Sequence, residues 1–235
     1  DAYNMLLNIE NNNWLKLKAV LGIWKVSKDG DDILLFEKGK NIETFNFLRQ
    51  QLKTSKHNLC LADYIGEGGD YMGAFVCTAG IDIEKKLDEF VKDLDDYSSI
   101  LLKSLADRLA EALTEFMHEK VRKEIWGYAK IENYTNDDLI KEKYDGIRPA
   151  PGYTACPDHT EKLKIFKILD AERIGVNLTE NMSMYPNATV SGYYFSYPGS
   201  KYFSVGKIQD DQLQDYAKRK KMTLNETEKW LRSNI

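Results

Sequence analysis

The segment from residue 147 to residue 160 reads Ile-Arg-Pro-Ala-Pro-Gly-Tyr-Thr-Ala-Cys-Pro-Asp-His-Thr. It places one permanently charged side chain, Arg148, beside backbone that does not favour a regular helix or strand. Its three prolines fix φ and remove N–H donors, so we expect the carbonyl groups between residues 149 and 157 to stay free for a ligand. The guanidinium of Arg148 can hold a carboxylate bidentately, Gly152 permits close backbone approach, and Tyr153 offers a flat aromatic face. These residue types suit a zwitterion that carries an aromatic base. The other interpretation is a rigid connector before a helix.

The same segment, with Tyr144-Asp-Gly before it and Glu-Lys after it, resembles the signature of the C-terminal activation domain of cobalamin-dependent methionine synthase. Further motifs of this family occur in the family's order, and they are Leu105-Ala-Asp-Arg-Leu-Ala-Glu-Ala, His118-Glu-Lys-Val-Arg-Lys, Trp126-Gly-Tyr, Ser191-Gly-Tyr-Tyr-Phe-Ser and Glu228-Lys-Trp-Leu. The resemblance covers nearly the whole chain and is weakest in the N-terminal quarter. It implies a mainly antiparallel twisted sheet flanked by helices.

The resemblance also implies a binding site for S-adenosylmethionine, which lies extended over the proline-rich loop. In the family, the arginine that corresponds to Arg148 pairs with the methionine carboxylate, and the residues that correspond to Tyr153 and Ala155 contact the nucleoside end. Glu111 and Glu142 correspond to carboxylates near the amino-acid end, where the ligand's ammonium group needs acceptors. These five positions are expected to bind the ligand.

Two aromatic residues and one acidic residue complete what the resemblance implies. Tyr202 and Phe203 correspond to a further wall of the site, and a sulfonium beside an aromatic face gains roughly 0.5 to 2 kcal/mol. The family uses this domain as a cap over cobalamin, which a neighbouring domain carries. Asp107 is therefore the expected contact with the cobalamin domain, and Tyr153 is expected to approach the corrin.

The implied activity is reductive methylation, in which inactive cob(II)alamin receives one electron from a flavodoxin-like donor and a methyl group from S-adenosylmethionine. This domain then needs no catalytic residue, because its contribution is to bind and orient the methyl donor. Zinc, folate and homocysteine belong to other domains of the family's full-length enzyme. Two alternatives remain: a stand-alone S-adenosylmethionine-binding partner or sensor that docks on a separate cobalamin protein, and an independent methyltransferase, which lacks support from a glycine loop or a candidate base.

Composition limits the other classes of function. The chain has 235 residues, 43% of them hydrophobic, and a formal net charge of -4, which suits a globular protein and argues against nucleic acid as the main partner. Three widely spaced cysteines do not form a disulfide framework and predict a reducing compartment, the cytoplasm. We expect no membrane span and no signal peptide. Because Asp1 already lies within a helical pattern, we interpret the chain as a fragment whose N-terminal part is missing.

Other possible sites are weaker. None of the three histidines lies beside a Ser or Cys in a recognised nucleophile motif, so a hydrolase is not expected. Cys156 and His159 have the spacing of half a zinc site, but a second pair of ligands is lacking nearby, and His159 is expected instead to orient the loop. The glycine cluster at residues 66–70 is interpreted as a hairpin loop, since we expect a strand after it.

The acidic residues Asp107, Glu111 and Glu115 recur every four residues, so their carboxylates share one face of a helix. From spacing alone, this stripe is a solvated helix face. The resemblance is what moves Glu111 from that face to the ligand site.

Hydrophobic periodicity and turn residues predict one α+β domain over residues 1–235. After a short N-terminal helix, the predicted strands are 14–26, 33–37, 58–65, 71–79, 182–185, 189–197 and 201–208. The further predicted helices are 42–54, 83–128 with a break near Asp95-Asp96, 137–144, 160–174 with Asp158 as a cap and Gly175 as its end, 210–220 and 224–233. Turns are expected at Asp29-Gly30 and at residues 197–200.

Overall fold

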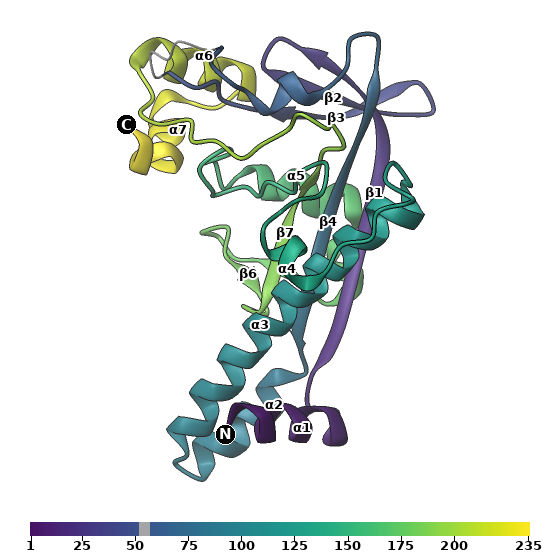
Figure 1. The fold of residues 1–235 in the computed structure, drawn as a ribbon. Coiled ribbons are helices and arrows are strands. Elements are labelled where there is room, and N and C mark those ends of the chain that lie inside the picture. Colours follow the sequence, from purple (N-terminus) through teal and green to yellow (C-terminus); the bar gives the residue numbers. More distant parts are fainter. Residues whose placement is uncertain (52–56) are drawn as a thin grey trace.

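One antiparallel sheet with helices on both faces forms the centre of the computed structural model, which describes residues 1–51 and 57–235 (Figure 1). The strand order is β3-β2-β1-β4-β7, and every neighbouring pair is antiparallel. The five strands are β1 Lys16–Asp29, β2 Asp32–Glu37, β3 Lys40–Asn46, β4 Asp70–Ile81 and β7 Thr189–Tyr194. A small ribbon pairs β5 Asn177–Leu178 with β6 Met184–Tyr185. The predicted α+β class is confirmed.

The β1–β2 hairpin turns where the sequence predicts it. Asp29 pairs with Asp32, and Gly30 adopts φ 60°, a left-handed conformation that glycine reaches without a Cβ penalty. Downstream, Ser200 N–H donates to the Tyr197 carbonyl at 3.0 Å, which confirms the predicted turn at residues 197–200.

Helix α3, Asp96–Lys120, packs on one face of the sheet and helix α5, Glu161–Leu169, on the other. Alternation along β4 explains this arrangement, because successive side chains point to opposite faces. Phe75 and Cys77 lie in a cluster with residues of α3, whereas Ala74 and Val76 lie in the cluster that includes residues of α5. Burial on both faces is why β4 reads as a continuous apolar run.

Apart from the short one at residues 136–140, the remaining helices pack at the two ends of the sheet (Figure 1). The remaining helices are α1 Ala2–Asn12, α2 Ile83–Lys92, α4 Asn136–Ile140, α6 Asp210–Lys220 and α7 Leu224–Leu231. The predicted break before α3 is confirmed, since Asp95 caps that helix by accepting from Ser98 N–H at 2.9 Å. A capping box of Thr223 and Glu226 begins α7, close to the predicted start of that helix. No helix within residues 1–51 and 57–235 is both long and apolar enough to span a membrane.

The predicted helix at residues 42–54 is wrong over its described part. Residues up to Asn46 form β3 instead, and residues 47–51 form no helix or strand; Thr54 lies outside the described residues. The physical reason is cross-strand pairing: Phe45 lies opposite Ile33 and Thr44 opposite Leu34, so pairing with β2 overrides local helix propensity.

Two predicted strands are also wrong. Within residues 58–65, Leu61–Tyr64 forms a 3-10 turn, η1, because Asp63 reaches back to accept from Cys60 N–H at 3.0 Å. Residues 201–208 run as an irregular strap, whose backbone bonds go to separate partners rather than to one strand. Val205 N–H donates to Thr154 O, for example, and Ile208 N–H to Asn234 O. Apolar content alone therefore did not specify a strand in either segment.

Helix boundaries differ from the sequence prediction around the loop. The predicted helix at 137–144 is shorter and ends at Ile140, and α5 ends at Leu169, followed by the one-turn segment Ala171–Ile174 and by Gly175 in the left-handed conformation. Asp158 accepts from Thr160 N–H at 2.7 Å, just before α5 begins. The long helical pattern at its other end closes in a π-helical turn, Val121–Ile125.

Candidate functional site

The start of the proline-rich loop continues the sheet along the edge of β7. Ile147 and Phe195 exchange two backbone hydrogen bonds of 3.0 Å, and the Pro149 carbonyl accepts from Tyr193 N–H at 2.9 Å. Ile147 is buried in the core on the α5 side. Because side chains alternate along an extended segment, Arg148 points to the opposite face, toward α3. Pairing with β7 thus fixes the direction of this arginine.

The expectation that the loop carbonyls stay free is wrong for most of them. The carbonyls of Ala150, Tyr153, Thr154 and Cys156 each accept a backbone N–H at 2.7 to 3.2 Å. Prolines remove donors but leave acceptors, so N–H groups from the loop itself and from the strap at 201–208 reach these carbonyls. The loop is rigid because it is closed on itself.

Gly152 is required by its neighbour within the protein. It adopts φ 95°, and a Cβ at this position would lie 2.2 Å from Cε1 of His159. His159 is in turn near Lys162, with Nδ1 and Nζ 3.0 Å apart. The imidazole therefore packs against the turn of the loop, in line with the predicted role of His159 in orienting it.

A cavity of about 350 Å³ opens between this loop, α3 and the sheet. Ten residues line it, and they are Phe75, Glu111, Arg148, Pro149, Ala150, Tyr153, Thr154, Ala155, Val190 and Tyr202. Its walls thus combine aromatic and aliphatic surface with one cation and one carboxylate, the composition of a small-molecule site. A larger hollow of about 760 Å³ lies over the β1–β2 hairpin, but no predicted site residue lines it.

Arg148 is held by three side chains behind the cavity. Nη1 donates to the Tyr144 hydroxyl at 2.8 Å and lies 3.1 Å from His118 Nδ1, while Nη2 is 2.7 Å from Glu115 Oε2. The backbone N–H of Arg148 donates to the hydroxyl of Tyr202 at 3.1 Å. These contacts leave the side chain 18% exposed, at the wall of the cavity.

The charge states around Arg148 follow from burial. Desolvation and the nearby arginines, Arg122 and Arg148, hold the pKa of His118 well below its ordinary value, so this imidazole is neutral and Nδ1 can accept a hydrogen bond from Arg148. Desolvation opposes the charge on Arg148, but Tyr144 and Glu115 outweigh it and raise its pKa. Burial raises the pKa of Tyr144 to about 12, so its hydroxyl stays protonated. The cavity therefore carries a permanent cation.

The structure brings five of the predicted ligand residues to this one cavity, namely Glu111, Arg148, Tyr153, Ala155 and Tyr202. Tyr153 stands at its rim with 69% of its surface exposed. Phe203 and Glu142 do not line it. The ring of Phe203 packs against core clusters on the other side of the strap, 6.5 Å from the ring of Tyr64, and Glu142 is exposed beyond α4.

Asp107, the predicted contact with the cobalamin domain, is exposed on α3. It lies one helical turn before Glu111, so both carboxylates share the helix face beside the cavity.

Several residues of the site carried no usable signal in the sequence. Phe75 and Val190 lie on strands that are apolar on both faces, so periodicity does not show which face meets the cavity. His118 and Tyr144 belong to family motifs, but the motifs alone do not indicate that these two side chains contact Arg148. Glu115 belongs to the acidic stripe, and only the fold turns it toward Arg148.

Cys156 and His159 do not assemble a metal site within the described residues, where no group of three or more His, Cys, Asp or Glu side chains could hold an ion. Cys156 is buried, and desolvation raises the pKa of its thiol well above the ordinary value.

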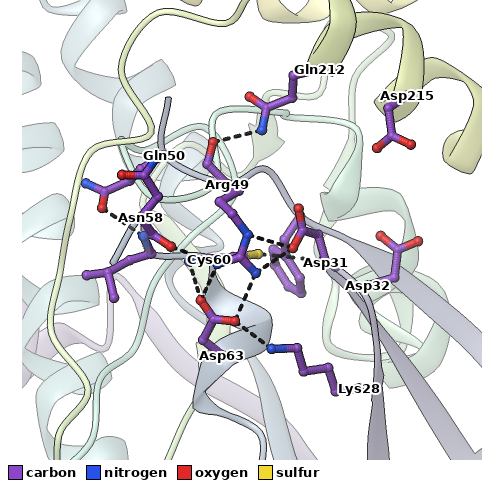
Figure 2. Close-up of polar contacts among 12 residues, drawn as sticks. Lys28, Asp31, Asp32, Arg49, Gln50, Asn58, Cys60, Asp63, Gln212 and Asp215 are labelled. Carbon is purple, nitrogen blue, oxygen red and sulfur yellow. Dashed lines mark hydrogen bonds and ion pairs between the residues drawn. The ribbon is translucent and has the colours of Figure 1, made fainter. Parts of the chain in front are cut away.

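A second arginine, Arg49, forms a separate charged cluster that the sequence did not predict (Figure 2). Its guanidinium donates to Asp31 from Nε and Nη2, to Asp63 from Nη1 and Nη2, and to the Asn58 carbonyl from Nη1, at 2.6 to 3.0 Å. Lys28 pairs with the same Asp63 at 2.6 Å. The cluster ties the hairpin, η1 and the segment before it together.

Comparison with known proteins agrees with this fold and site. The family model described as the vitamin B12-dependent methionine synthase activation domain matches residues 1–221. The chain therefore belongs to that family. A solved structure described as the crystal structure of the MetH reactivation domain bound to AdoHcy is similar over 100% of this chain and 75% of that chain, with 46% sequence identity and a TM-score of 0.97.

Proposed function

We propose that the cavity beside Arg148 binds S-adenosylmethionine and that this domain presents the methyl group to cob(II)alamin for the reductive reactivation of methionine synthase. The observation that carries the proposal is the convergence of Arg148, Glu111 and Tyr153 on one cavity in a chain of this family. The AdoHcy named for the solved relative is S-adenosylhomocysteine, the demethylated form of the same ligand. Its presence there supports binding of this class of ligand.

The chemistry of the cavity matches both ends of such a ligand. The amino-acid end carries a carboxylate, for which Arg148 is the donor, and an ammonium group, for which Glu111 is the acceptor. The nucleoside end requires a flat apolar surface, which the loop offers at Tyr153 and Ala155. Aromatic rings at Phe75 and Tyr202 can face a sulfonium, an attraction worth roughly 0.5 to 2 kcal/mol.

In this proposal, the residues of the domain bind and orient, and none of them transfers a proton. Cobalamin, carried by a neighbouring domain, would supply the metal centre that takes up the methyl group. With one electron from a flavodoxin-like donor, cobalamin would accept the methyl group of S-adenosylmethionine as a cation equivalent, and S-adenosylhomocysteine would remain. Holding the sulfonium at a fixed place is then the domain's contribution to the rate.

We further propose that the partner of this cavity is the cobalamin-binding domain of the same enzyme, with Asp107 and Tyr153 at the contact, and that the enzyme is cytoplasmic. The exposure of Asp107 and Tyr153 next to the cavity supports this contact. The match of the family model over residues 1–221 favours an enzyme domain over a stand-alone sensor that docks on a separate cobalamin protein.

Titration calorimetry tests the proposal. S-adenosylmethionine should bind the wild-type protein, and Arg148→Ala should weaken binding by about 1.5 to 3 kcal/mol, the loss of a hydrogen-bonded partner for a charged group. This is a rise in Kd of roughly 10- to 160-fold. The matched control is Arg173→Ala, which removes an exposed arginine from Ala171–Ile174 and should leave the Kd unchanged.

The outcomes separate two failures. If the wild-type protein does not bind S-adenosylmethionine or S-adenosylhomocysteine, the proposed function is wrong. If it binds and Arg148→Ala binds equally well, the ligand lies elsewhere and Arg148 is not part of its site.

A further inference from the structure

A chain of alternating charges runs from the protein interior to the cavity. Glu132 accepts from Arg122 Nε at 2.9 and 3.0 Å, Arg122 Nη1 lies 3.9 Å from Glu115 Oε1, and Glu115 Oε2 lies 2.7 Å from Arg148 Nη2. Arg122 is fully buried and Glu132 nearly so. The chain ends at Arg148, the only one of the four that lines the cavity.

Arg122 does more than carry charge, because it also supports Tyr144. Its Cζ lies 3.9 Å from the centre of the Tyr144 ring, and the hydroxyl of that ring accepts from Arg148 Nη1. His118 completes the support, since its ring packs edge-on against Tyr144 at 5.0 Å and is stacked on Tyr194 at 5.2 Å. Arg148 is therefore held by two side chains of α3, Glu115 and His118, and by Tyr144, which follows α4.

A count of donors shows what these contacts leave for a ligand. Of the five N–H groups of Arg148, the two on Nη1 are directed to Tyr144 and His118, whereas Nη2 forms an ion pair with Glu115 at 2.7 Å. Among the described residues, Nε has no hydrogen-bond partner. Nε and Nη2 therefore still offer the two donors that a bidentate carboxylate requires.

We infer that Glu115 is a positioning residue: backed by buried Arg122, it holds the guanidinium of Arg148 so that the Nε and Nη2 edge is presented to the carboxylate of the ligand. This inference rests on the proposed function and deepens it. Glu115 itself does not line the cavity. It therefore acts through Arg148, and its loss should affect only ligands that carry the carboxylate.

The test compares two ligands in the whole domain by calorimetry. S-adenosylmethionine carries the carboxylate, whereas decarboxylated S-adenosylmethionine lacks it and keeps the ammonium, the sulfonium and the nucleoside. For the isosteric variant Glu115→Gln, we expect the Kd for S-adenosylmethionine to rise about tenfold and the Kd for the decarboxylated ligand to change less than about twofold. Glu119→Gln, one turn further along α3 in a partly exposed pair with Lys123, is the matched control and should change neither Kd.

Other outcomes overturn the inference while leaving the proposed function intact. If Glu115→Gln weakens the binding of both ligands equally, Glu115 contacts the ammonium or only stabilises the fold. If the Kd for S-adenosylmethionine is unchanged or lower, Glu115 competes with the ligand for Arg148. Tyr144→Phe provides a second test with no loss of charge, because it removes only the acceptor of Nη1. It should raise the Kd for S-adenosylmethionine roughly threefold and leave the Kd for the decarboxylated ligand unchanged. Absence of binding to the wild-type protein would instead contradict the proposed function.

Discussion

Arg49 and Arg148 are both partly buried arginines that carboxylates neutralise, yet the structure uses them differently. Arg49 is the more exposed, with 30% of its side chain accessible against 18% for Arg148. All five N–H donors of Arg49 are taken by Asp31, Asp63 and the Asn58 carbonyl (Figure 2). Arg148 lines a cavity, and its Nε has no hydrogen-bond partner among the described residues. The two arginines therefore differ in how many of their donors the protein itself takes, and not only in exposure.

Loss of Arg49 should reduce stability and leave ligand binding unchanged. Arg49→Met should lower the free energy of unfolding by about 2 to 4 kcal/mol, because Asp31 and Asp63 lose their shared partner while remaining partly buried. Urea denaturation measures the loss, with Arg173→Met as the control. The same variant should bind S-adenosylmethionine with unchanged affinity under native conditions. A weaker ligand affinity with unchanged stability would reverse the roles assigned to the two arginines.

A second prediction concerns Phe203, which the family resemblance assigns to the ligand wall. Its half-buried ring packs in the core, so Phe203→Ala should cost about 2 to 3 kcal/mol of unfolding free energy, less than for a fully buried phenylalanine. Calorimetry should show the same ligand affinity as for the wild-type protein. Loss of affinity without loss of stability would place this ring in the site after all.

Acid should weaken the Arg49 cluster selectively. Desolvation raises the pKa of Asp63, but hydrogen bonds from Arg49 and Lys28 outweigh it and lower the value from 3.8 to about 2. A carboxyl group with a lower pKa in the folded state stabilises the protein above its unfolded pKa, and this stability is lost as the pH falls from 3.8 toward 2. The wild-type protein should therefore lose about 1 to 2 kcal/mol more than Asp63→Asn over this window, after allowance for solvent screening. Parallel acid-stability curves for the two proteins would contradict this account.

The smallest predicted effect lies at Tyr202, next to Phe203. Its hydroxyl accepts from Arg148 N–H and lines the cavity, so Tyr202→Phe should weaken S-adenosylmethionine binding by about 0.5 to 1.5 kcal/mol and change stability little. If the strap separates these two rings, calorimetry and denaturation should give opposite results for the two variants. Tyr202→Phe should lose ligand affinity and keep its stability, whereas Phe203→Ala should keep its ligand affinity and lose stability. Similar changes in ligand affinity and in unfolding free energy for both variants would show that both rings lie on the same side of the strap.

Sequence reasoning identified the loop and most of the cavity because the family motif is continuous in the chain. It could not separate Tyr202 from Phe203, since neighbouring residues in an extended segment point to opposite sides and the motif does not say which side meets the ligand. Arg49 carried no signal because its acceptors come from three separate places, the hairpin, η1 and the Asn58 backbone. Residues 42–46 were misread for a similar reason, as a strand there depends on its partner β2.

The most direct test of the central claim is a crystal structure of this domain with S-adenosylhomocysteine bound. The account predicts the ligand in the cavity, its carboxylate about 3 Å from Nε and Nη2 of Arg148, and its nucleoside against Tyr153 and Ala155. Arg148 should keep its contacts with Glu115 and Tyr144. A ligand bound in the hollow over the β1–β2 hairpin, or a carboxylate that does not contact Arg148, would contradict the account.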